Sequence, residues 1–317
     1  MRERVVLPRC FDLRQTLDCG QAFRWRELSH EEDACMWEGA AFGRALKLRQ
    51  TKDSILLFCS EEEFEAVWRG YFDLDADYEE KRRRLSAISP ILAEASSYAP
   101  GIRILRQDSW EALCSFLISQ NNNIPRIKGI IERFCQAFGS PIPGSSFFSF
   151  PTPEALASRC LEDLAPLRAG FRAKYLLDAA KKVAGGEISL EEISRESAGF
   201  GRIELQKILG VGPKVAECTL LYGYHKTDCF PMDVWMKRAM AILLPDYSAE
   251  DFGEDAGLAQ QYLFHYSRMH PEPFRPVLKQ AEPACLSLLV TPVLQNRPEK
   301  ESRCLYEKAD RPCESCR

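Results

Sequence analysis

The amino-acid sequence predicts an α+β protein, with a small antiparallel β-rich N-terminal domain (residues 1–80) before a mostly α-helical domain (residues 81–268). Three observations support this fold class. Short runs of alternating apolar and polar residues continue to about residue 60, as in half-buried strands. From about Tyr78, apolar residues recur at helical spacing. Near the end of the helical part, a glycine pair separates two apolar-periodic segments, which is typical of a tight turn between helices.

In the N-terminal part, residues 25–50 and 53–60 are predicted to form short strands, and EEEFEAVWRGYF (residues 61–72) is predicted to be helical. Gly20 lies just before the first strand, within FDLRQTLDCGQAFRW. On the residues alone, an ordinary turn glycine is as good an interpretation as a functional one.

The helical part contains recognisable starts and stops. The triplet Asn121–Asn123 predicts a turn between two apolar helices, the first of which is capped by Asp108 or by Ser109. A proline-rich loop leads to a helix that starts near Pro153, and Gly185-Gly186 ends the helix after that.

The segment Leu205–Ala239 (LQKILGVGPKVAECTLLYGYHKTDCFPMDVWMKRA) carries the strongest functional signal. Gly210, Val211 and Gly212 form a tight turn, and Pro213 suits the first position of the next helix. Free backbone N–H groups and the helix dipole at such a start favour an anion such as a phosphate. Most glycine pairs of this kind are only turns, so the neighbouring residues decide the interpretation.

Lys214 and Asp233 are those neighbours. Lys214 falls in the first helical turn, where the dipole disfavours a cation and so favours the neutral amine of a nucleophile. The alternative is a solvated lysine that binds phosphate. Asp233 has the position of an N-cap for a third helix, and a capping carboxylate can also face a neighbouring site.

The composition indicates which class of protein and which compartment to expect. The chain has 317 residues, a formal net charge of −4, 13 cysteines and no run of 18 apolar residues. The net charge argues against a generally basic nucleic-acid-binding protein, but it does not exclude local contacts between a few basic residues and DNA. The cysteines lie mostly in apolar runs, as Cys114 and Cys135 do, which indicates free thiols. Without a signal peptide, we expect an intracellular protein that has no membrane association.

GVGPK followed by an aspartate nineteen residues after the lysine resembles the helix-hairpin-helix Gly/Pro-Asp superfamily of base-excision glycosylases. KVAEC and FPMDVWMKR resemble the 8-oxoguanine DNA glycosylase family in particular, and the resemblance covers residues 11–266. It implies that Lys214 is the nucleophile and that Asp233 stabilises positive charge on the sugar. It also implies that Gly210, Val211 and Gly212 bind a DNA phosphate.

The resemblance assigns further roles. The lesion base would lie in a pocket of Gly20, Cys218, Gln260 and Phe264, where the Gly20 carbonyl accepts from the N7–H of 8-oxoguanine. Guanine lacks that proton, so its N7 would repel the carbonyl.

Four further residues would act at the gap in the duplex and on the unpaired cytosine. Asn121 would fill the gap left by the flipped base, Phe171 would wedge into the stack, and Arg126 with Arg172 would contact the unpaired cytosine.

Two features depart from the family pattern. Trp235 stands where related proteins have a histidine near a phosphate, so no phosphate role is carried to it. The tail, residues 269–317, is expected to be a poorly ordered extension. Its cysteines (Cys285, Cys304, Cys313 and Cys316) have the pattern C-x18-C-x8-C-x2-C, in which the spacing is wider than that of the ligands of an iron–sulfur cluster. A metal site formed by these cysteines is the alternative interpretation of the tail.

These observations predict a monomeric, bifunctional glycosylase and lyase that needs neither a metal nor an organic cofactor. Its substrate is expected to be duplex DNA with 8-oxoguanine, preferably opposite cytosine. One alternative is a related glycosylase for another base, such as thymine glycol or an alkylpurine. The other is a non-catalytic helix-hairpin-helix module in which Lys214 and Asp233 only bind and cap.

Overall fold

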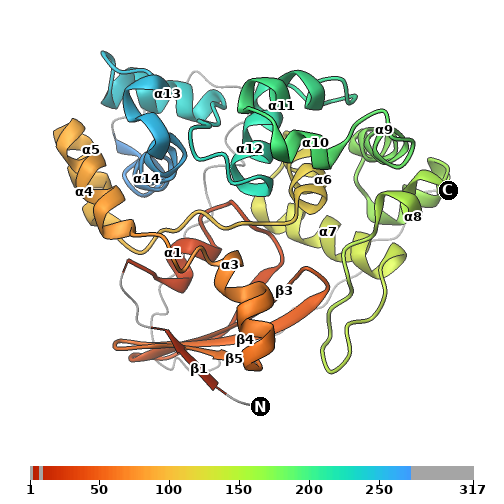
Figure 1. Cartoon of the computed structure of the whole chain (residues 1–317), viewed down its shortest axis with the longest axis horizontal. Helices are drawn as coiled ribbons and strands as arrows, with labels where there is room; N and C mark the ends of the chain where they lie inside the picture. Colours follow the sequence, from red (N-terminus) through yellow and green to blue (C-terminus); the bar gives the residue numbers. More distant parts are fainter. Residues whose placement is uncertain (1–2, 7–9, 273–317) are drawn as a thin grey trace, which may run out of the picture.

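The computed structural model describes residues 3–6 and 10–272, in which a sheet lies below a larger group of helices (Figure 1). The sheet is antiparallel, with strand order β1-β5-β4-β3-β2. Its strands are β1 (Glu3–Val6), β2 (Trp25–His30), β3 (Ala34–Ala41), β4 (Arg44–Thr51) and β5 (Ile55–Phe58). The predicted α+β fold class is confirmed. Strand β1 was not predicted, because four residues are too few to show a pattern and the strand depends on distant pairing with β5.

The hairpin between β3 and β4 shows how local sequence sets the register. Phe42 and Gly43 connect the strands with φ angles of 50° and 71°, and positive φ at both positions defines a turn whose twist matches the strands. Leu46 and Leu48 then alternate onto the buried face of β4, and Leu48 pairs with Leu57 of β5. One face of the sheet is therefore apolar and requires a cover.

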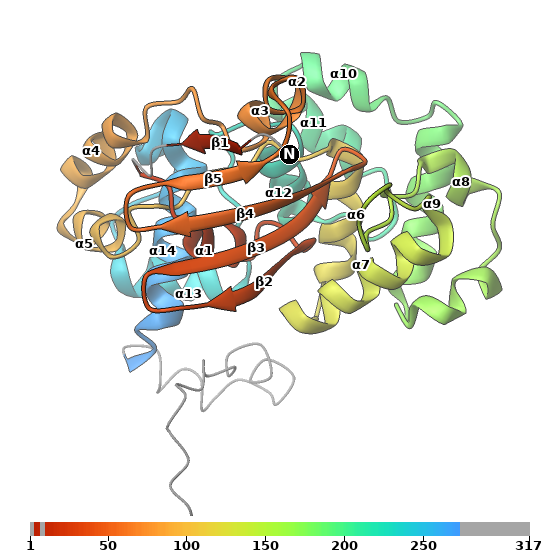
Figure 2. The ribbon, with the colours of Figure 1, turned by 90° about the horizontal axis from the view of Figure 1, so that it is seen from below.

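Aromatic side chains provide that cover. The segment predicted to be helical forms α2 (Glu61–Glu63), a π-helical turn (Phe64–Trp68) and α3 (Arg69–Tyr71). Trp68, Tyr71 and Phe72 pack against Trp25 of β2, and the Trp25 indole N–H donates to the Tyr71 hydroxyl at 2.7 Å. Figure 2 shows the sheet in front of the helical layers. The N-terminal part thus has its own apolar core.

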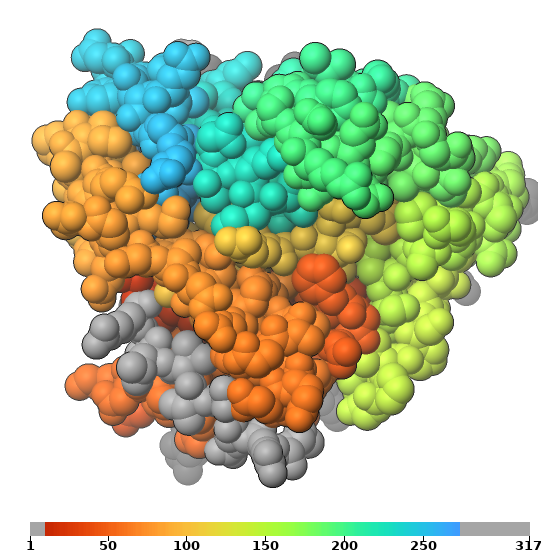
Figure 3. Space-filling view, viewed as in Figure 1, coloured from red at the N-terminus to blue at the C-terminus, as the bar shows by residue number. Residues whose placement is uncertain are grey.

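Of the remaining helices, α1 packs on the core of the sheet, and the others form the larger group of helices (Figures 1 and 3). Their starts follow the expected caps, since Asp108 caps α6 and Pro153 opens α8. The helices are α1 (Leu13–Leu17), α4 (Tyr78–Ile88), α5 (Pro90–Tyr98), α6 (Ser109–Ser119), α7 (Ile124–Phe138), α8 (Pro153–Ala157), α9 (Arg172–Ala184), α10 (Leu190–Arg195), α11 (Ala198–Leu205), α12 (Pro213–Gly223), α13 (Val234–Leu243) and α14 (Ala256–Met269), with short 3-10 turns at Glu162–Leu167 and Ala249–Asp255.

Asp73 links the two halves. Its buried carboxylate accepts from the Tyr78 hydroxyl at 3.0 Å and from the Arg106 guanidinium at 2.9 Å, and His225, which follows α12, lies 3.4 Å away. Burial would raise the pKa of Asp73, but the contacts with His225 and Arg106 outweigh it and lower the pKa to about 2. This charged cluster ties the N-terminal half to the end of the hairpin's second helix.

Candidate active site

The hairpin between α11 and α12 has the geometry of an anion site. Gly210 has a φ of +85°, and a Cβ there would lie 2.5 Å from the Tyr175 ring. Gly212 is the N-cap of α12, has no side chain to satisfy the first N–H groups, and faces open space. Asp178 fixes the turn by accepting from the Leu209 backbone N–H at 2.6 Å. The start of α12 therefore presents backbone donors outward, as a phosphate site requires.

Gly210→Ala is expected to lower the free energy of unfolding by about 1–3 kcal/mol, because the new methyl group requires a left-handed backbone and collides with Tyr175. Gly212→Ala is the matched control, since Gly212 has an extended backbone and free space around its Cα. Thermal denaturation of both variants compares them. Equal destabilisation would contradict the requirement for glycine at position 210.

Lys214 lies at the start of α12, against α6. Its Nζ is 3.4 Å from Ser119 Oγ and 5.2 Å from the centre of the Phe116 ring. Within the described part of the chain, no carboxylate lies within ion-pair distance of this amine. The amine is half-buried and is not committed to a structural ion pair, which suits a nucleophile.

Asp233 caps α13, as expected: its Oδ1 accepts from the Met236 N–H at 2.7 Å. Cys218, one turn beyond Lys214, is 3% exposed, and burial raises the pKa of its thiol to about 11. The charge of Lys214 opposes this shift and the charge of Asp233 adds to it. The charges of Lys214 and Asp233 therefore both act on the Cys218 thiol, as the predicted grouping of these three residues requires.

Gly20 is the next residue of the predicted lesion pocket. Its φ is +92°, and a Cβ there would lie 3.9 Å from both Phe264 Cε1 and Ile124 Cδ1. Gln21 holds this segment: its Nε2 donates to the Arg103 carbonyl at 2.7 Å and its Oε1 accepts from the Leu105 N–H at 2.9 Å. The fold thus places Gly20 next to Phe264 and to the start of α7.

Gln260 lies on the same helix as Phe264 and is buried. Its neighbour Gln261 donates to Gln260 Oε1 at 3.0 Å and also to the Tyr222 hydroxyl. The Tyr222 ring stacks on Phe116, the ring beneath Lys214, with centroids 5.3 Å apart. A chain of contacts through Gln261, Tyr222 and Phe116 therefore joins Gln260 to the Lys214 amine.

Sequence reasoning missed Tyr222 and Gln261. A signal was present for Tyr222, since positions 214, 218 and 222 recur every four residues and share one face of α12. Nothing in the sequence pointed to Gln261, because its partners come from another helix and from its own neighbour.

The asparagine turn lies between α6 and α7 as predicted. Asn123 caps α7, and Asn122 is buried and donates to the Ile118 carbonyl at 3.1 Å. Asn121 is exposed at the tip and has a φ of +45°. The most exposed of the three asparagines is therefore the one proposed to enter the DNA.

The two arginines differ in their surroundings. Arg126 is exposed, whereas Arg172 is 2% exposed, and its guanidinium donates to the carbonyls of Gln120 (2.8 Å) and Asn121 (2.7 Å). Burial lowers the pKa of Arg172, and the charge of Arg126 acts in the same direction. Here Arg172 holds the asparagine turn and does not join Arg126 at the surface. Exposed Phe171 lies beside it, with the Arg172 guanidinium 4.4 Å from the ring centre.

Trp235 has a structural contact in place of a phosphate role. Its indole N–H donates to Ser267 Oγ at 2.9 Å and so joins α13 to α14. The departure from the family pattern noted in the sequence therefore leaves Trp235 as a packing residue that orients the helix carrying Gln260 and Phe264.

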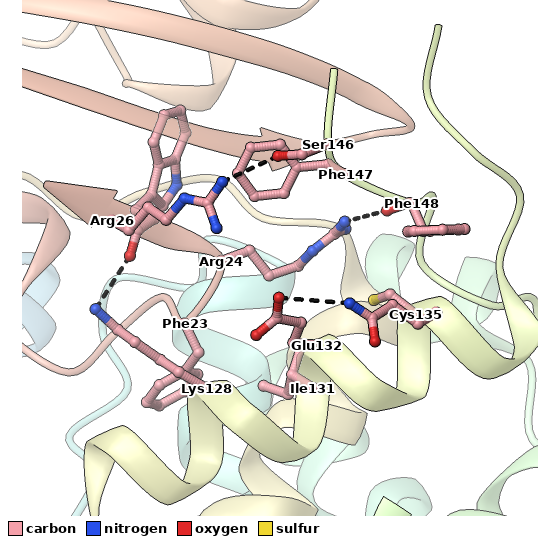
Figure 4. A pocket seen from close by; sticks show the side chains of 12 residues that line it. Phe23, Arg24, Arg26, Lys128, Ile131, Glu132, Cys135, Ser146, Phe147 and Phe148 are labelled. Atoms are coloured by element: carbon pink, nitrogen blue, oxygen red, sulfur yellow. Dashed lines mark hydrogen bonds between the residues drawn. The ribbon is translucent and has the colours of Figure 1, made fainter. Parts of the chain in front are cut away.

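A separate cavity lies between β2, α7 and the loop that precedes α8 (Figure 4). Arg24 crosses it, pairs with buried Glu111 at 3.1 Å and also donates to the Phe148 carbonyl. Arg26 donates to Ser146, and Lys128 donates to the Trp25 carbonyl at 3.0 Å. None of the predicted site residues lines this cavity, and its cations are already engaged in joining the two halves.

Among residues 3–6 and 10–272, none of the helices has the length and apolar character of a membrane-spanning segment, and no three metal-ligating side chains lie together. Cys114, Cys135 and Cys218 are free thiols and are buried, as expected. Cys285, Cys304, Cys313 and Cys316, and with them the proposed metal alternative, lie outside the described residues.

The fold and the site together define a helix-hairpin-helix base-excision DNA glycosylase. Residues 4–113 match the family model "8-oxoguanine DNA glycosylase, N-terminal domain", and residues 114–248 match "HhH-GPD superfamily base excision DNA repair protein". The chain belongs to the 8-oxoguanine DNA glycosylase family.

Individual similar proteins support the assignment to this family. A Saccharomyces cerevisiae "N-glycosylase/DNA lyase" is 32% identical over 71% of this chain and 66% of its own. The structure of MBOgg1 with a low-affinity DNA ligand is 41% identical, with a TM-score of 0.79 over 85% of this chain and 96% of that one. The Clostridium acetobutylicum 8-oxoguanine glycosylase/lyase, in complex with DNA that has cytosine opposite 8-oxoguanine, is 37% identical, with a TM-score of 0.77 over 85% and 98%.

Proposed function

We propose that this chain excises 8-oxoguanine from duplex DNA and then nicks the strand, with Lys214 as the nucleophile. The observation that carries the proposal is the position of Lys214 at the uncapped start of α12, where its amine has no carboxylate partner among the described residues. Cys218 lies one turn further along the helix, and the charges of Lys214 and Asp233 both act on its thiol. The solved relative with 8-oxoguanine opposite cytosine supports the same substrate.

The proposed reaction has two stages. The hairpin N–H groups bind a phosphate while the damaged nucleotide leaves the helix. The Lys214 lone pair attacks C1′, the bond from C1′ to the base breaks, and the base leaves with the bonding electrons and takes up a proton. Asp233 stabilises the positive charge that develops on the sugar. The sugar ring then opens to a Schiff base on Lys214, and loss of a C2′ proton expels the 3′ phosphate.

Recognition of the lesion is proposed to depend on Gly20. Its carbonyl accepts from N7–H of 8-oxoguanine, whereas the N7 of guanine is itself an acceptor and is repelled. Glycine at this position gives the backbone close access to the base, and the hydrogen bonds of Gln21 fix the backbone that carries it. Phe264 supports one face of the base, and Cys218 packs against the other.

A lesion panel tests this function. Borohydride trapping is run on duplexes that carry 8-oxoguanine, thymine glycol, an alkylpurine or undamaged guanine. We expect a covalent adduct with 8-oxoguanine opposite cytosine and little with the others. An adduct formed only with the oxidised pyrimidine would contradict the lesion assignment, and no adduct with any duplex would favour a binding module.

Arg126→Met is expected to flatten the preference for cytosine opposite the lesion without changing thermal stability, because Arg126 is exposed. A contact of this kind is worth about 1–3 kcal/mol, or roughly 10- to 100-fold. Single-turnover rates opposite each of the four bases measure the preference. An unchanged profile would remove Arg126 from cytosine recognition.

Arg172→Met is expected to have a different effect from Arg126→Met. Arg172 holds the carbonyls of Gln120 and Asn121, so its loss is expected to destabilise the protein by about 1–3 kcal/mol. Because the asparagine turn is no longer held, we expect slower excision opposite all four bases. Denaturation and the same rate measurements distinguish this outcome from that of Arg126→Met.

A further inference from the structure

Arg268 is an exposed cation beside the predicted lesion pocket. Its guanidinium carbon lies 5.4 Å from the centre of the Phe264 ring, which comes one turn earlier on α14. That ring is half-buried, and a Cβ on Gly20 would lie 3.9 Å from its Cε1 atom. The guanidinium therefore lies next to the ring that is expected to support the damaged base, and its side chain is open to solvent.

The charge of Arg268 also acts on its surroundings. Burial raises the pKa of the Cys19 thiol to about 11, and the positive charge of Arg268 is one of the influences that oppose this rise. Burial lowers the pKa of His265, and the charge of Arg268 acts in the same direction. Cys19 directly precedes Gly20, so the charge of Arg268 is felt on the pocket segment as well as on α14.

The guanidinium of Arg268 is not engaged by the protein. Within the described part of the chain, it has no ion pair and no hydrogen bond to another residue. Lys128 differs, because its amine lies 3.3 Å from Asp18 and donates to the Trp25 carbonyl at 3.0 Å. A guanidinium without a carboxylate partner keeps its forked N–H donors for an anion, and this fork matches the oxygens of a phosphate.

Trp235 cannot supply such a donor. Its single N–H donates to Ser267 Oγ at 2.9 Å, and the Ser267 hydroxyl in turn donates to the Phe264 carbonyl at 3.1 Å. These contacts fix the chain directly before Arg268, whereas the long side chain of Arg268 extends into solvent. Arg268 therefore combines a fixed attachment beside the pocket with a free and adaptable charged group.

We propose that Arg268 binds a backbone phosphate of the flipped nucleotide and so helps to hold the damaged base in the pocket. The proposal rests on the proposed function, since it assumes that the base stacks on Phe264. The phosphates are joined to the sugar that carries the base, so they are drawn to the mouth of the pocket when the base enters. Arg268 therefore favours the flipped state over the state in which the base is stacked in the duplex.

The test measures DNA binding over a series of salt concentrations, by fluorescence anisotropy. All proteins carry Lys214→Gln, and the duplexes hold either 8-oxoguanine opposite cytosine or undamaged guanine. We expect Arg268→Met to weaken binding to the 8-oxoguanine duplex by roughly tenfold. The slope of log affinity against log salt should also become shallower by about one, as loss of one phosphate contact requires. Binding to the undamaged duplex should keep its affinity and slope.

Two further variants serve as controls. Arg268→Lys keeps the charge, so we expect it to keep the salt slope and to lose less affinity than Arg268→Met. Arg49→Met is the matched control, because Arg49 is an exposed arginine on β4, outside the predicted site, with no ion pair among the described residues. It should change neither affinity nor slope. Thermal denaturation shows whether each variant is folded.

The outcomes separate this proposal from the proposed function. If the Lys214→Gln protein bound both duplexes equally, the lesion recognition in the proposed function would itself be refuted. If that protein preferred the 8-oxoguanine duplex and Arg268→Met left the salt slope unchanged, Arg268 would bind no phosphate and the inference would be overturned. Equal losses on both duplexes would make Arg268 a general DNA contact, and a change of slope as large for Arg49→Met would be equally contrary.

Discussion

Replacement of Lys214 by glutamine is expected to abolish covalent trapping and to slow excision of 8-oxoguanine by more than about 1,000-fold. Glutamine has nearly the length of lysine but no nucleophilic lone pair, so the bond to C1′ cannot form. DNA binding should weaken much less, because the hairpin N–H groups remain. Single-turnover excision and binding to an undamaged duplex, measured on the same preparation, separate the two effects.

Lys226→Gln is the control for this change. Lys226 follows the other end of α12, where its amine donates to the backbone carbonyls of Ser194 and Glu196. We expect it to keep the wild-type rate. If Lys214→Gln excised the base as fast as this control does, Lys214 would be only a phosphate contact.

Asp233→Asn is expected to slow excision by about 100- to 1,000-fold while thermal stability stays nearly unchanged. Asparagine caps helices about as well as aspartate, so the bond to the Met236 N–H is kept and only the negative charge is lost. The variant therefore separates the capping role of Asp233 from its role opposite the sugar. Single-turnover rates and denaturation curves are the two measurements.

Asp108→Asn makes the same substitution at a different cap. Asp108 starts α6 and accepts from the Glu111 N–H at 2.8 Å, the same arrangement as at α13. It should change neither rate nor stability appreciably. A wild-type rate in Asp233→Asn would mean that Asp233 is a cap and nothing more.

Local signals in the sequence were sufficient for several of these features. The caps Asp108 and Asp233 and the glycines of the hairpin between α11 and α12 are set by a few neighbouring residues, and the structure contains each of them. Helix starts depend on side chains within three positions, which is why the sequence alone predicts them.

Other features depend on contacts between distant segments. Ser119 meets Lys214 across 95 positions, and Gln261 meets Tyr222 across 39. The family resemblance placed Arg172 on the cytosine, but here its guanidinium is buried against the carbonyls of the asparagine turn. No local pattern in the sequence shows that the Arg172 guanidinium is buried whereas Arg126 is exposed, so this difference appears only in the packed structure.

The central claim is that Lys214 is the nucleophile. The most direct test is to locate the covalent bond between the protein and the DNA. Wild-type protein is trapped with borohydride on a duplex with 8-oxoguanine opposite cytosine, digested, and mapped by mass spectrometry. We predict that the reduced sugar adduct is on the peptide that contains Lys214 and on the Nζ of that lysine. An adduct on any other amine, or a nicked product without an adduct, would contradict the account.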